Sequence, residues 1–195
     1  MRDKYGAGDD VYCWPGTTVL KNRLGIMDAA TLEQAEAEFA AVAVQTIEIT
    51  APPFDAAYLQ HLHRQLFADV YDWAGLFRTV DISKAGTRFC TATRIAPELA
   101  KALDLLDRPE VARLSRSRLV AHVAECYGEV NMVHPFREGN GRAQRLFFEH
   151  WLLAHGIGVS WERVHHDEWV AACIAAVACD YSGLAAIFDR CMAPI

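Results

Sequence analysis

The spacing of hydrophobic residues along the chain predicts a fold built mainly from helices. In most segments apolar residues recur every three or four positions, as they do on the buried face of an amphipathic helix. The strongest example is the series Leu59, Leu62, Leu66, Val70 and Trp73. It predicts a core-facing helix that ends near Gly75. Further helical segments are predicted near Ile95, Ser115, Arg142, Glu168 and Leu184.

The first helix is predicted to begin at Thr31. Thr31 and Gln34 have the spacing of a capping box, in which side chains at the start of a helix bind its free backbone amides. The apolar positions that follow are Leu32, Ala35, Phe39 and Val42. We expect these four side chains to face the core.

A change of period marks residues 77–90 as a β-hairpin. Val80 and Ile82 alternate with Asp81 and Ser83, which is the repeat of a strand, and Ala85-Gly86 offers a turn. Lys84 would lie at the tip of this hairpin and Phe89 on its returning strand. The prediction is therefore an all-α fold with one short hairpin.

The chain is long enough to form one compact unit with a sizeable core. Its 195 residues are 52% hydrophobic and 23% charged, a composition typical of an ordered domain. No linker rich in Gly, Pro or Ser separates two cores. We expect residues 56–195 to form the domain and residues 1–55 to be an amino-terminal extension with one helix packed on it.

Charge and cysteine usage exclude several classes of function. The net charge of −6 weighs against an extended nucleic-acid surface, and no apolar run has the length of a membrane span or a signal peptide core. The six cysteines contain no Cys-x-x-Cys pair, and the eight histidines lack the spacing of a zinc site. We expect a cytoplasmic protein without direct nucleic-acid or membrane partners.

Residues 134–145 contain a loop that suits phosphate binding. Gly139, Asn140 and Gly141 allow the backbone to turn its amides inward, and the helix predicted from Arg142 adds the positive end of its dipole. Arg142 and Arg145 are three positions apart, so we expect their guanidinium groups to share one face and bind phosphate oxygens.

Two further residues of this loop could supply reaction chemistry. Glu138 is a hard oxygen ligand placed to bind Mg²⁺ together with phosphates. His134 could be a general base, because free imidazole titrates near pH 6.5. Phe136 would anchor the loop in the core, and Pro135 would limit its flexibility. Each residue alone also fits an ordinary glycine-rich turn between two helices, but their combination in one loop favours chemistry.

The loop resembles the signature of the Fic family. Residues 134–145 match His-x-Phe-x-Asp/Glu-Gly-Asn-Gly-Arg-x-x-Arg at every specified position. Residues 77–90 are similar to the flap hairpin of that family. Residues 15–22 resemble the amino-terminal signature of small bacterial members, among them the cell filamentation protein and stand-alone toxins. The resemblance therefore extends over nearly the whole chain.

The resemblance implies a Fic-type helical bundle with a short β-hairpin flap, and a protein adenylyltransferase. Such an enzyme transfers AMP from ATP-Mg²⁺ to a Tyr, Ser or Thr hydroxyl and releases pyrophosphate. His134 would deprotonate the hydroxyl, Glu138 would bind Mg²⁺, and Arg145 would reach the γ-phosphate. The α- and β-phosphates would be surrounded by Gly139, Asn140, Gly141 and Arg142. Phosphorylating relatives have lysine at the position of Gly141, so its presence here favours AMP transfer.

The flap is implied to dock the target protein. Its edge includes Asp81, Ile82 and Ser83, and Phe89 is either a clamp on the target side chain or a core aromatic residue. Lys84 would meet nucleotide or target at the tip, although a solvated turn lysine fits equally well.

Control of the activity is also implied by the resemblance. Many family members carry an inhibitory helix with the pattern Ser/Thr-x-x-x-Glu-Gly/Asn, whose glutamate pairs with the second arginine of the signature, here Arg145. The only glutamate followed by Gly or Asn in this chain is Glu138. We therefore expect a separate small antitoxin that supplies such a helix. Analogy with bacterial toxins suggests DNA gyrase and topoisomerase IV as targets.

A non-catalytic binding module on the same scaffold is the alternative. The intact His134, Glu138 and Arg145 argue against it.

Overall fold

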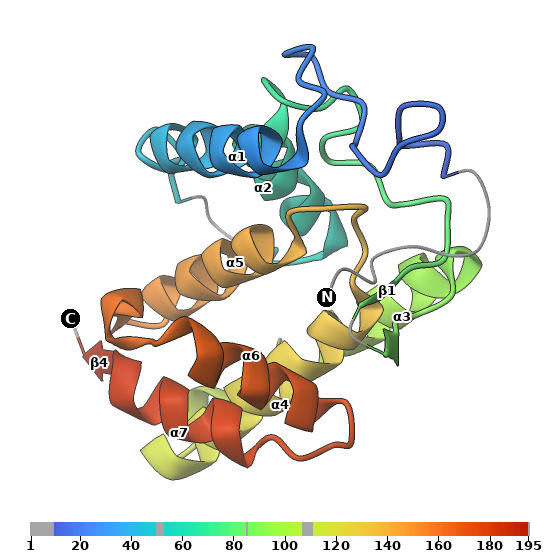
Figure 1. The fold of residues 1–195 in the computed structure, drawn as a ribbon. Coiled ribbons are helices and arrows are strands. Elements are labelled where there is room, and N and C mark those ends of the chain that lie inside the picture. The colour runs from blue at the N-terminus through green and yellow to red at the C-terminus, as the bar shows by residue number, and fades with distance from the viewer. Residues whose placement is uncertain (1–9, 50–52, 85, 107–110, 195) are drawn as a thin grey trace.

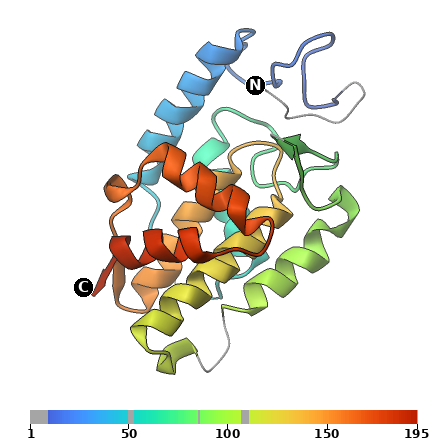
Figure 2. The same ribbon diagram turned by 60° about the horizontal axis from the view of Figure 1, so that its bottom comes forward.

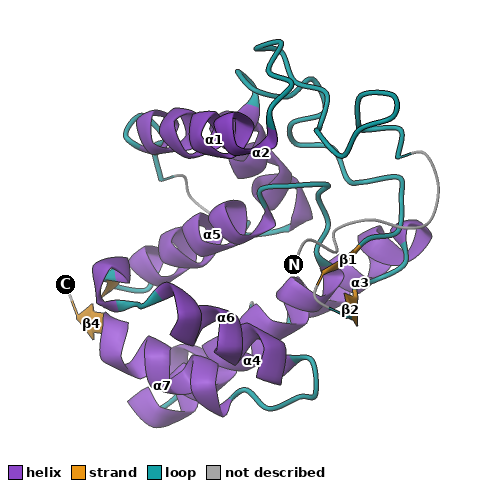
Figure 3. Ribbon diagram, viewed as in Figure 1, coloured by secondary structure: helices purple, strands orange, loops and turns teal. Residues whose placement is uncertain are grey.

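The computed structural model describes residues 10–49, 53–84, 86–106 and 111–194, and helices dominate them (Figures 1 and 3). The helices are α1 (Ala29–Val44), α2 (Ala56–Phe67), α3 (Ile95–Asp104), α4 (Arg116–Val133), α5 (Asn140–Ala154), α6 (His166–Ala176) and α7 (Ser182–Cys191). Short 3₁₀ turns cover Ala92–Arg94, Val111–Arg113 and Trp161–Arg163. The expected helical fold with a hairpin is confirmed.

Helix α4 lies at the centre of the molecule. It packs against α3, α5, α6 and α7, while α2 packs against both α5 and α1 (Figures 1 and 2). Because neighbours surround it, α4 is apolar on most sides, and Val123, Ala124 and Cys126 are all fully buried. Large aromatic side chains are fully buried in the core, among them Tyr127, Phe147, Phe148, Trp151 and Phe188. None of the described helices has the length and hydropathy that crossing a bilayer requires.

Helix α1 differs from its prediction in where it begins. The helix starts at Ala29, and Asp28 is its N-cap rather than Thr31. The Asp28 carboxylate accepts hydrogen bonds from the Thr31 backbone amide at 2.8 Å and from the Thr31 hydroxyl at 2.7 Å. Aspartate is as good a cap as serine or threonine, and here it takes the helix start one turn earlier.

The buried face of α1 also differs from the prediction. Leu32, Glu36 and Ala40 are buried, whereas Phe39 and Val42 are exposed to solvent. A count of apolar residues could not find this face, because a glutamate lies at its centre. Glu36 is buried because it binds two polar side chains of the core, as described below.

Helix α2 ends at Phe67 rather than near Gly75. Beyond Phe67 the chain folds back along the helix, so that a Cβ atom on Gly75 would lie 2.8 Å from the Arg64 side chain. The Gly75 amide donates a hydrogen bond to His63 of the same helix at 2.9 Å. The buried residue Val70 therefore belongs to a turn, although its spacing suits a helix.

The expected hairpin consists of β1 (Ser83–Lys84) and β2 (Thr87–Arg88), which are antiparallel with Ser83 opposite Arg88. Ala85 of the predicted turn lies outside the described residues. Asp81 is a structural residue at the base of this flap. Its carboxylate pairs with Arg88 at 3.0 Å and accepts the Ala92 amide at 2.8 Å.

A second antiparallel strand pair was not predicted. It joins β3 (Ile157–Val159), just after α5, to β4 (Met192–Pro194) at the end of the chain. The expected division between residues 55 and 56 stays a prediction. Buried residues from both sides of it, such as Leu20, Leu32 and Leu59, belong to one continuous hydrophobic cluster.

Candidate active site

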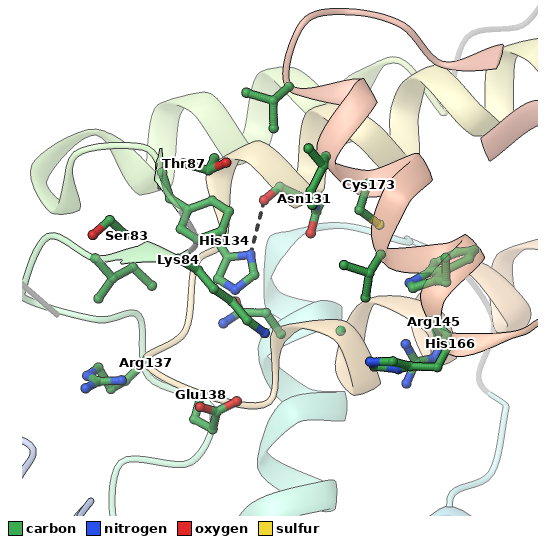
Figure 4. A pocket seen from close by; sticks show the side chains of 18 residues that line it. Ser83, Lys84, Thr87, Asn131, His134, Arg137, Glu138, Arg145, His166 and Cys173 are labelled. Atoms are coloured by element: carbon green, nitrogen blue, oxygen red, sulfur yellow. Dashed lines mark hydrogen bonds between the residues drawn. The ribbon is translucent and has the colours of Figure 1, made fainter. Parts of the chain in front are cut away.

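The loop between α4 and α5 forms the floor of a cavity (Figure 4). Helix α4 ends at Val133, and His134 follows in the left-handed conformation with φ 48°. Pro135 prevents the helix from continuing through this point. At the other end of the loop, Gly139 has φ 78° and leads directly into α5. The chain thus makes two sharp turns within six residues.

The cavity has a volume of about 290 Å³, near the lower end of the range for small-molecule sites. One wall is the flap, which contributes Ile82, Ser83, Lys84, Thr87 and Phe89. The floor comes from Asn131, His134, Arg137, Glu138, Asn140, Gly141 and Arg145. The opposite wall is α6, with His166, Trp169, Val170, Cys173, Ile174 and Val177. This third wall was not anticipated from the sequence, where it was indistinguishable from a core face.

His134 is held with one ring nitrogen available for chemistry. Its ring stacks on Phe89, with 3.9 Å between ring centroids. Its Nδ1 lies 3.2 Å from the Asn131 carbonyl oxygen, which can only accept, so Nδ1 carries the proton (Figure 4). The second nitrogen, Nε2, then keeps its lone pair. Burial lowers the pKa of His134 to about 3, so the imidazole is neutral at physiological pH.

Phe136 is anchored in the core by His63. The Phe136 side chain is only 1% exposed, and its ring stacks on the His63 ring at 3.8 Å. His63 accepts the Gly75 amide at Nδ1 and therefore donates from Nε2 to the Glu138 carbonyl oxygen, both at 2.9 Å. In the sequence, the histidines outside the loop, His63 among them, were considered only as possible zinc ligands. Its role as a loop support depends on a contact between residues far apart in the chain.

The burial of the neutral His63 ring predicts an acid-sensitive fold. Burial lowers the pKa of His63 to about 4 from its usual 6.5. In the unfolded chain His63 binds a proton below about pH 6.5, whereas in the folded chain it stays neutral down to about pH 4. The contribution of His63 to the free energy of unfolding is therefore fully present above pH 6.5. It is lost as the pH falls from 6.5 to 4, by about 3 kcal/mol in total.

Urea unfolding of the parent and of His63→Gln between pH 7 and pH 4.5 would measure this loss. The glutamine side chain would keep a donor for Glu138 but would not titrate. We expect the free energy of unfolding of the parent to fall more steeply than that of the variant, by about 1.4 kcal/mol per pH unit. Equal slopes for the two proteins would contradict the role of His63.

The residues of the glycine-rich turn have distinct positions. Asn140 is buried, and its side chain binds both the amide and the carbonyl of Phe136 at 2.8 Å. That side chain supports the loop, so only the Asn140 backbone is available to a ligand. A Cβ atom on Gly139 would lie 2.4 Å from the Phe67 ring. Gly141 lines the cavity, and a Cβ atom there would approach the Arg145 guanidinium only to 3.5 Å.

The two arginines of α5 point to different places, contrary to the expectation of a shared phosphate grip. Arg142 binds the Glu36 carboxylate at 2.5 Å and lies over the Phe67 ring at 4.7 Å. Tyr71 donates to the other oxygen of Glu36. Arg145 lines the cavity and makes no hydrogen bond or ion pair with another described residue. The free guanidinium of Arg145 is therefore the one available to an anion.

Glu138 is the carboxylate of the cavity floor. One of its oxygens accepts the Gly139 amide at 3.1 Å, which places the carboxylate at the start of α5. Within the described ranges no group of three His, Cys, Asp or Glu side chains could hold a metal. A single carboxylate beside a helix N-terminus nevertheless fits Mg²⁺, which usually takes one or two carboxylates and completes its shell with phosphate oxygens and water.

Arg137 was not singled out from the sequence. It is 2% exposed and pairs with Asp10 at 2.6 Å, an interaction that attaches the amino-terminal segment to the loop. Of the flap residues singled out, Ile82, Ser83, Lys84 and Phe89 line the cavity, whereas Asp81 does not.

Comparison with known proteins relates this site to one family. The sequence model of the Fic/DOC family matches residues 53–152. A probable protein adenylyltransferase Fic of Salmonella typhimurium is 40% identical over 191 residues, which cover 97% of this chain and 96% of the relative.

Solved structures show the same fold. BepC from Bartonella tribocorum, with bound AMPPNP, has a TM-score of 0.86 at 27% identity and covers 94% of this chain and 97% of its own. An amino-terminal Fic domain from a Bartonella quintana effector, with bound ADP, has a TM-score of 0.87 at 28% identity. The match covers 94% of each chain.

Proposed function

Because the chain belongs to the Fic/DOC family, we propose that it is a protein adenylyltransferase that transfers AMP from ATP-Mg²⁺ to a Tyr, Ser or Thr hydroxyl of a target protein. The observation that carries this proposal is the cavity floor. There the neutral imidazole of His134, the free guanidinium of Arg145 and the start of α5 face one space. Relatives that share the fold were solved with AMPPNP or ADP bound.

The geometry supports an in-line displacement. Nε2 of His134 removes the proton from the target hydroxyl, and the oxygen attacks the α-phosphorus as the bond to the β-phosphate oxygen breaks. Pyrophosphate leaves with the electron pair of that bond. Amides at the start of α5 and the Arg145 guanidinium neutralise phosphate charge. Mg²⁺, when held by Glu138 and the nucleotide, would add further charge neutralisation.

The α6 wall supports a nucleotide rather than a bare phosphate. Trp169 is almost fully buried, and Cys173, Ile174 and Val177 extend an apolar surface along the cavity. A planar purine base suits such a surface. Arg145 then receives the terminal phosphate of the nucleotide.

Labelling with two forms of ATP tests the proposal. The purified protein is incubated with Mg²⁺ and cell lysate, using label on either the α- or the γ-phosphate. We expect protein bands labelled only from the α-position. Label from the γ-position would indicate phosphorylation, and no label from either would indicate a non-catalytic binding module.

The flap offers an edge for an extended target segment. The Phe89 amide donates to the Ile82 carbonyl at 3.2 Å, so these two residues form a hydrogen-bonded pair. Such pairs alternate with non-bonded ones along an antiparallel ladder, and Ser83 with Arg88 is the next pair. The Ser83 amide therefore points away from β2, where a target backbone could accept it.

Replacing Ser83 by proline should weaken target docking without opening the hairpin. Proline removes the outward amide, and it is tolerated at an edge-strand position whose amide makes no bond to the neighbouring strand. The loss of one backbone hydrogen bond should lower kcat/KM for the protein target about tenfold. Ser83→Ala, which keeps the amide, is the matched control. Equal kcat/KM for the proline and alanine variants would exclude docking through this edge.

Arg145 supports control by a separate antitoxin. Its guanidinium has no acidic partner in the described part of the chain, so an external glutamate could bind it and block the terminal phosphate. We propose that a small antitoxin with a Ser/Thr-x-x-x-Glu-Gly/Asn helix supplies this glutamate. We also propose that gyrase or topoisomerase IV is the target of the enzyme. Expression with and without the neighbouring small reading frame tests this. Equal growth, equal target modification and no co-purifying peptide would rule it out.

A further inference from the structure

Arg78 is a buried cation whose partners are backbone carbonyl groups. Only 2% of the residue is exposed. Its guanidinium donates to the carbonyls of Val133 and His134 at 3.2 and 2.9 Å. It also donates to the carbonyls of Val80, at 2.7 Å, and of Cys90. One side chain thus joins two separate parts of the candidate active site.

The first part is the backbone around His134. Besides the two guanidinium bonds, the Arg78 amide donates to the Pro135 carbonyl at 2.9 Å, so residue 78 holds three consecutive carbonyls. His134 has a left-handed backbone, which costs a residue with a Cβ atom about 1–2 kcal/mol. A cation at the carboxyl end of α4 also interacts favourably with the helix dipole. Arg78 therefore stabilises the turn that places the imidazole.

The second part is the flap. Val80 precedes β1 and Cys90 follows β2, so the two acceptors are the two stems of the hairpin. The Cys90 amide also donates to the Met132 carbonyl of α4 at 3.0 Å. Hydrogen bonds therefore connect both stems to the end of α4. A lysine could not do the same, because its single nitrogen cannot span acceptors in two segments.

We propose that Arg78 is a positioning residue that sets the distance between the flap edge and Nε2 of His134. This proposal rests on the proposed function, in which the flap presents a hydroxyl to that nitrogen. Reacting atoms must approach to about 3 Å, and a displacement of about 1 Å can cost about 100-fold in rate. Arg78 does not line the cavity, so it acts through the backbone on both sides.

Arg78→Lys tests this role, with Arg94→Lys as the matched control. Arg94 is exposed and lies outside the cavity, so the same chemical change there should alter nothing. At a temperature where both variants are folded, we expect Arg78→Lys to lower kcat/KM for protein AMP transfer about 30-fold. The dissociation constant for ATP should change less than twofold, because Arg145 and the start of α5 do not depend on the flap. The slow attack of water on ATP should fall only about threefold.

A merely structural role would give a different pattern. The melting temperature of Arg78→Lys would fall, while transfer and water attack would be reduced by the same factor or not at all. That result would overturn the proposal. Failure of the parent protein to label any target would instead count against the proposed function.

Hydrogen exchange tests the coupling in the parent protein and needs no activity. The amides of Arg78 and Cys90 donate across this junction to Pro135 and Met132, and the His134 amide donates to Val130 at the end of α4. If Arg78 joins the two parts, these amides should exchange with one common free energy of opening. Independent opening of the flap, with Cys90 exchanging well before His134, would overturn the proposal even if Arg78→Lys did not fold.

Discussion

Replacing His134 by alanine should reduce AMP transfer by at least 10²-fold and up to about 10⁴-fold, the usual effect of removing a general base. The neutral imidazole presents a free lone pair at Nε2 because Nδ1 is bound to the Asn131 carbonyl. Alanine has no group that could take the proton of the target hydroxyl. ATP affinity should be nearly unchanged, because Arg145 and the start of α5 remain.

His134→Asn separates base chemistry from packing. Asparagine adopts the left-handed conformation more easily than most residues, and its amide can replace the Nδ1 donor to Asn131. It offers no basic nitrogen in place of Nε2. Both variants should therefore lose transfer while isothermal titration shows parental ATP binding. An active His134→Asn enzyme would mean that the imidazole serves structure only.

Gly139→Ala should lower transfer by about 10²-fold and also destabilise the fold. A Cβ atom there would lie 2.4 and 2.5 Å from two atoms of the Phe67 ring, and Phe67 is itself buried. Relief of this overlap requires the loop to move away from α2, which displaces the start of α5 relative to His134. Steady-state transfer and urea unfolding measure the two effects.

Two variants divide the effect into its causes. Gly156→Ala has a similar positive φ of 75° but no atom within 4 Å, so it should cost only the backbone strain of about 1–2 kcal/mol and leave transfer unchanged. Phe67→Leu, combined with Gly139→Ala, removes ring atoms at the point of overlap and should restore part of the transfer rate. A double variant no better than Gly139→Ala would mean that the overlap is not the cause.

Local patterns predicted most helices of this protein but not their exact faces and ends. The segments near Ile95, Ser115 and Leu184 are helices as predicted. Helix α1 shows the limit, since Glu36 is at the centre of its buried face. A buried carboxylate is stable only with partners, and its partners Tyr71 and Arg142 are distant in sequence.

For the candidate site, too, local sequence predicted one part and contacts between distant residues decided the other. The order of residues from His134 to Arg145 was sufficient by itself to indicate the family and the site, because a turn, a helix start and a base close in sequence are necessarily close in space. The sequence alone therefore predicted the loop that lines the cavity of the structure. It also predicted the flap hairpin, from the alternation around Ile82 and the turn signal that follows.

Tertiary structure alone decided which of those side chains face the cavity and what holds them there. Arg145 faces the cavity and Arg142 does not, because Glu36 of α1 holds Arg142 against Phe67. His63 and Arg78 support the loop through bonds to backbone carbonyls that come from other parts of the chain. Backbone carbonyls are present at every residue and leave no sequence pattern, so only the packing of the helices reveals which of them these side chains bind.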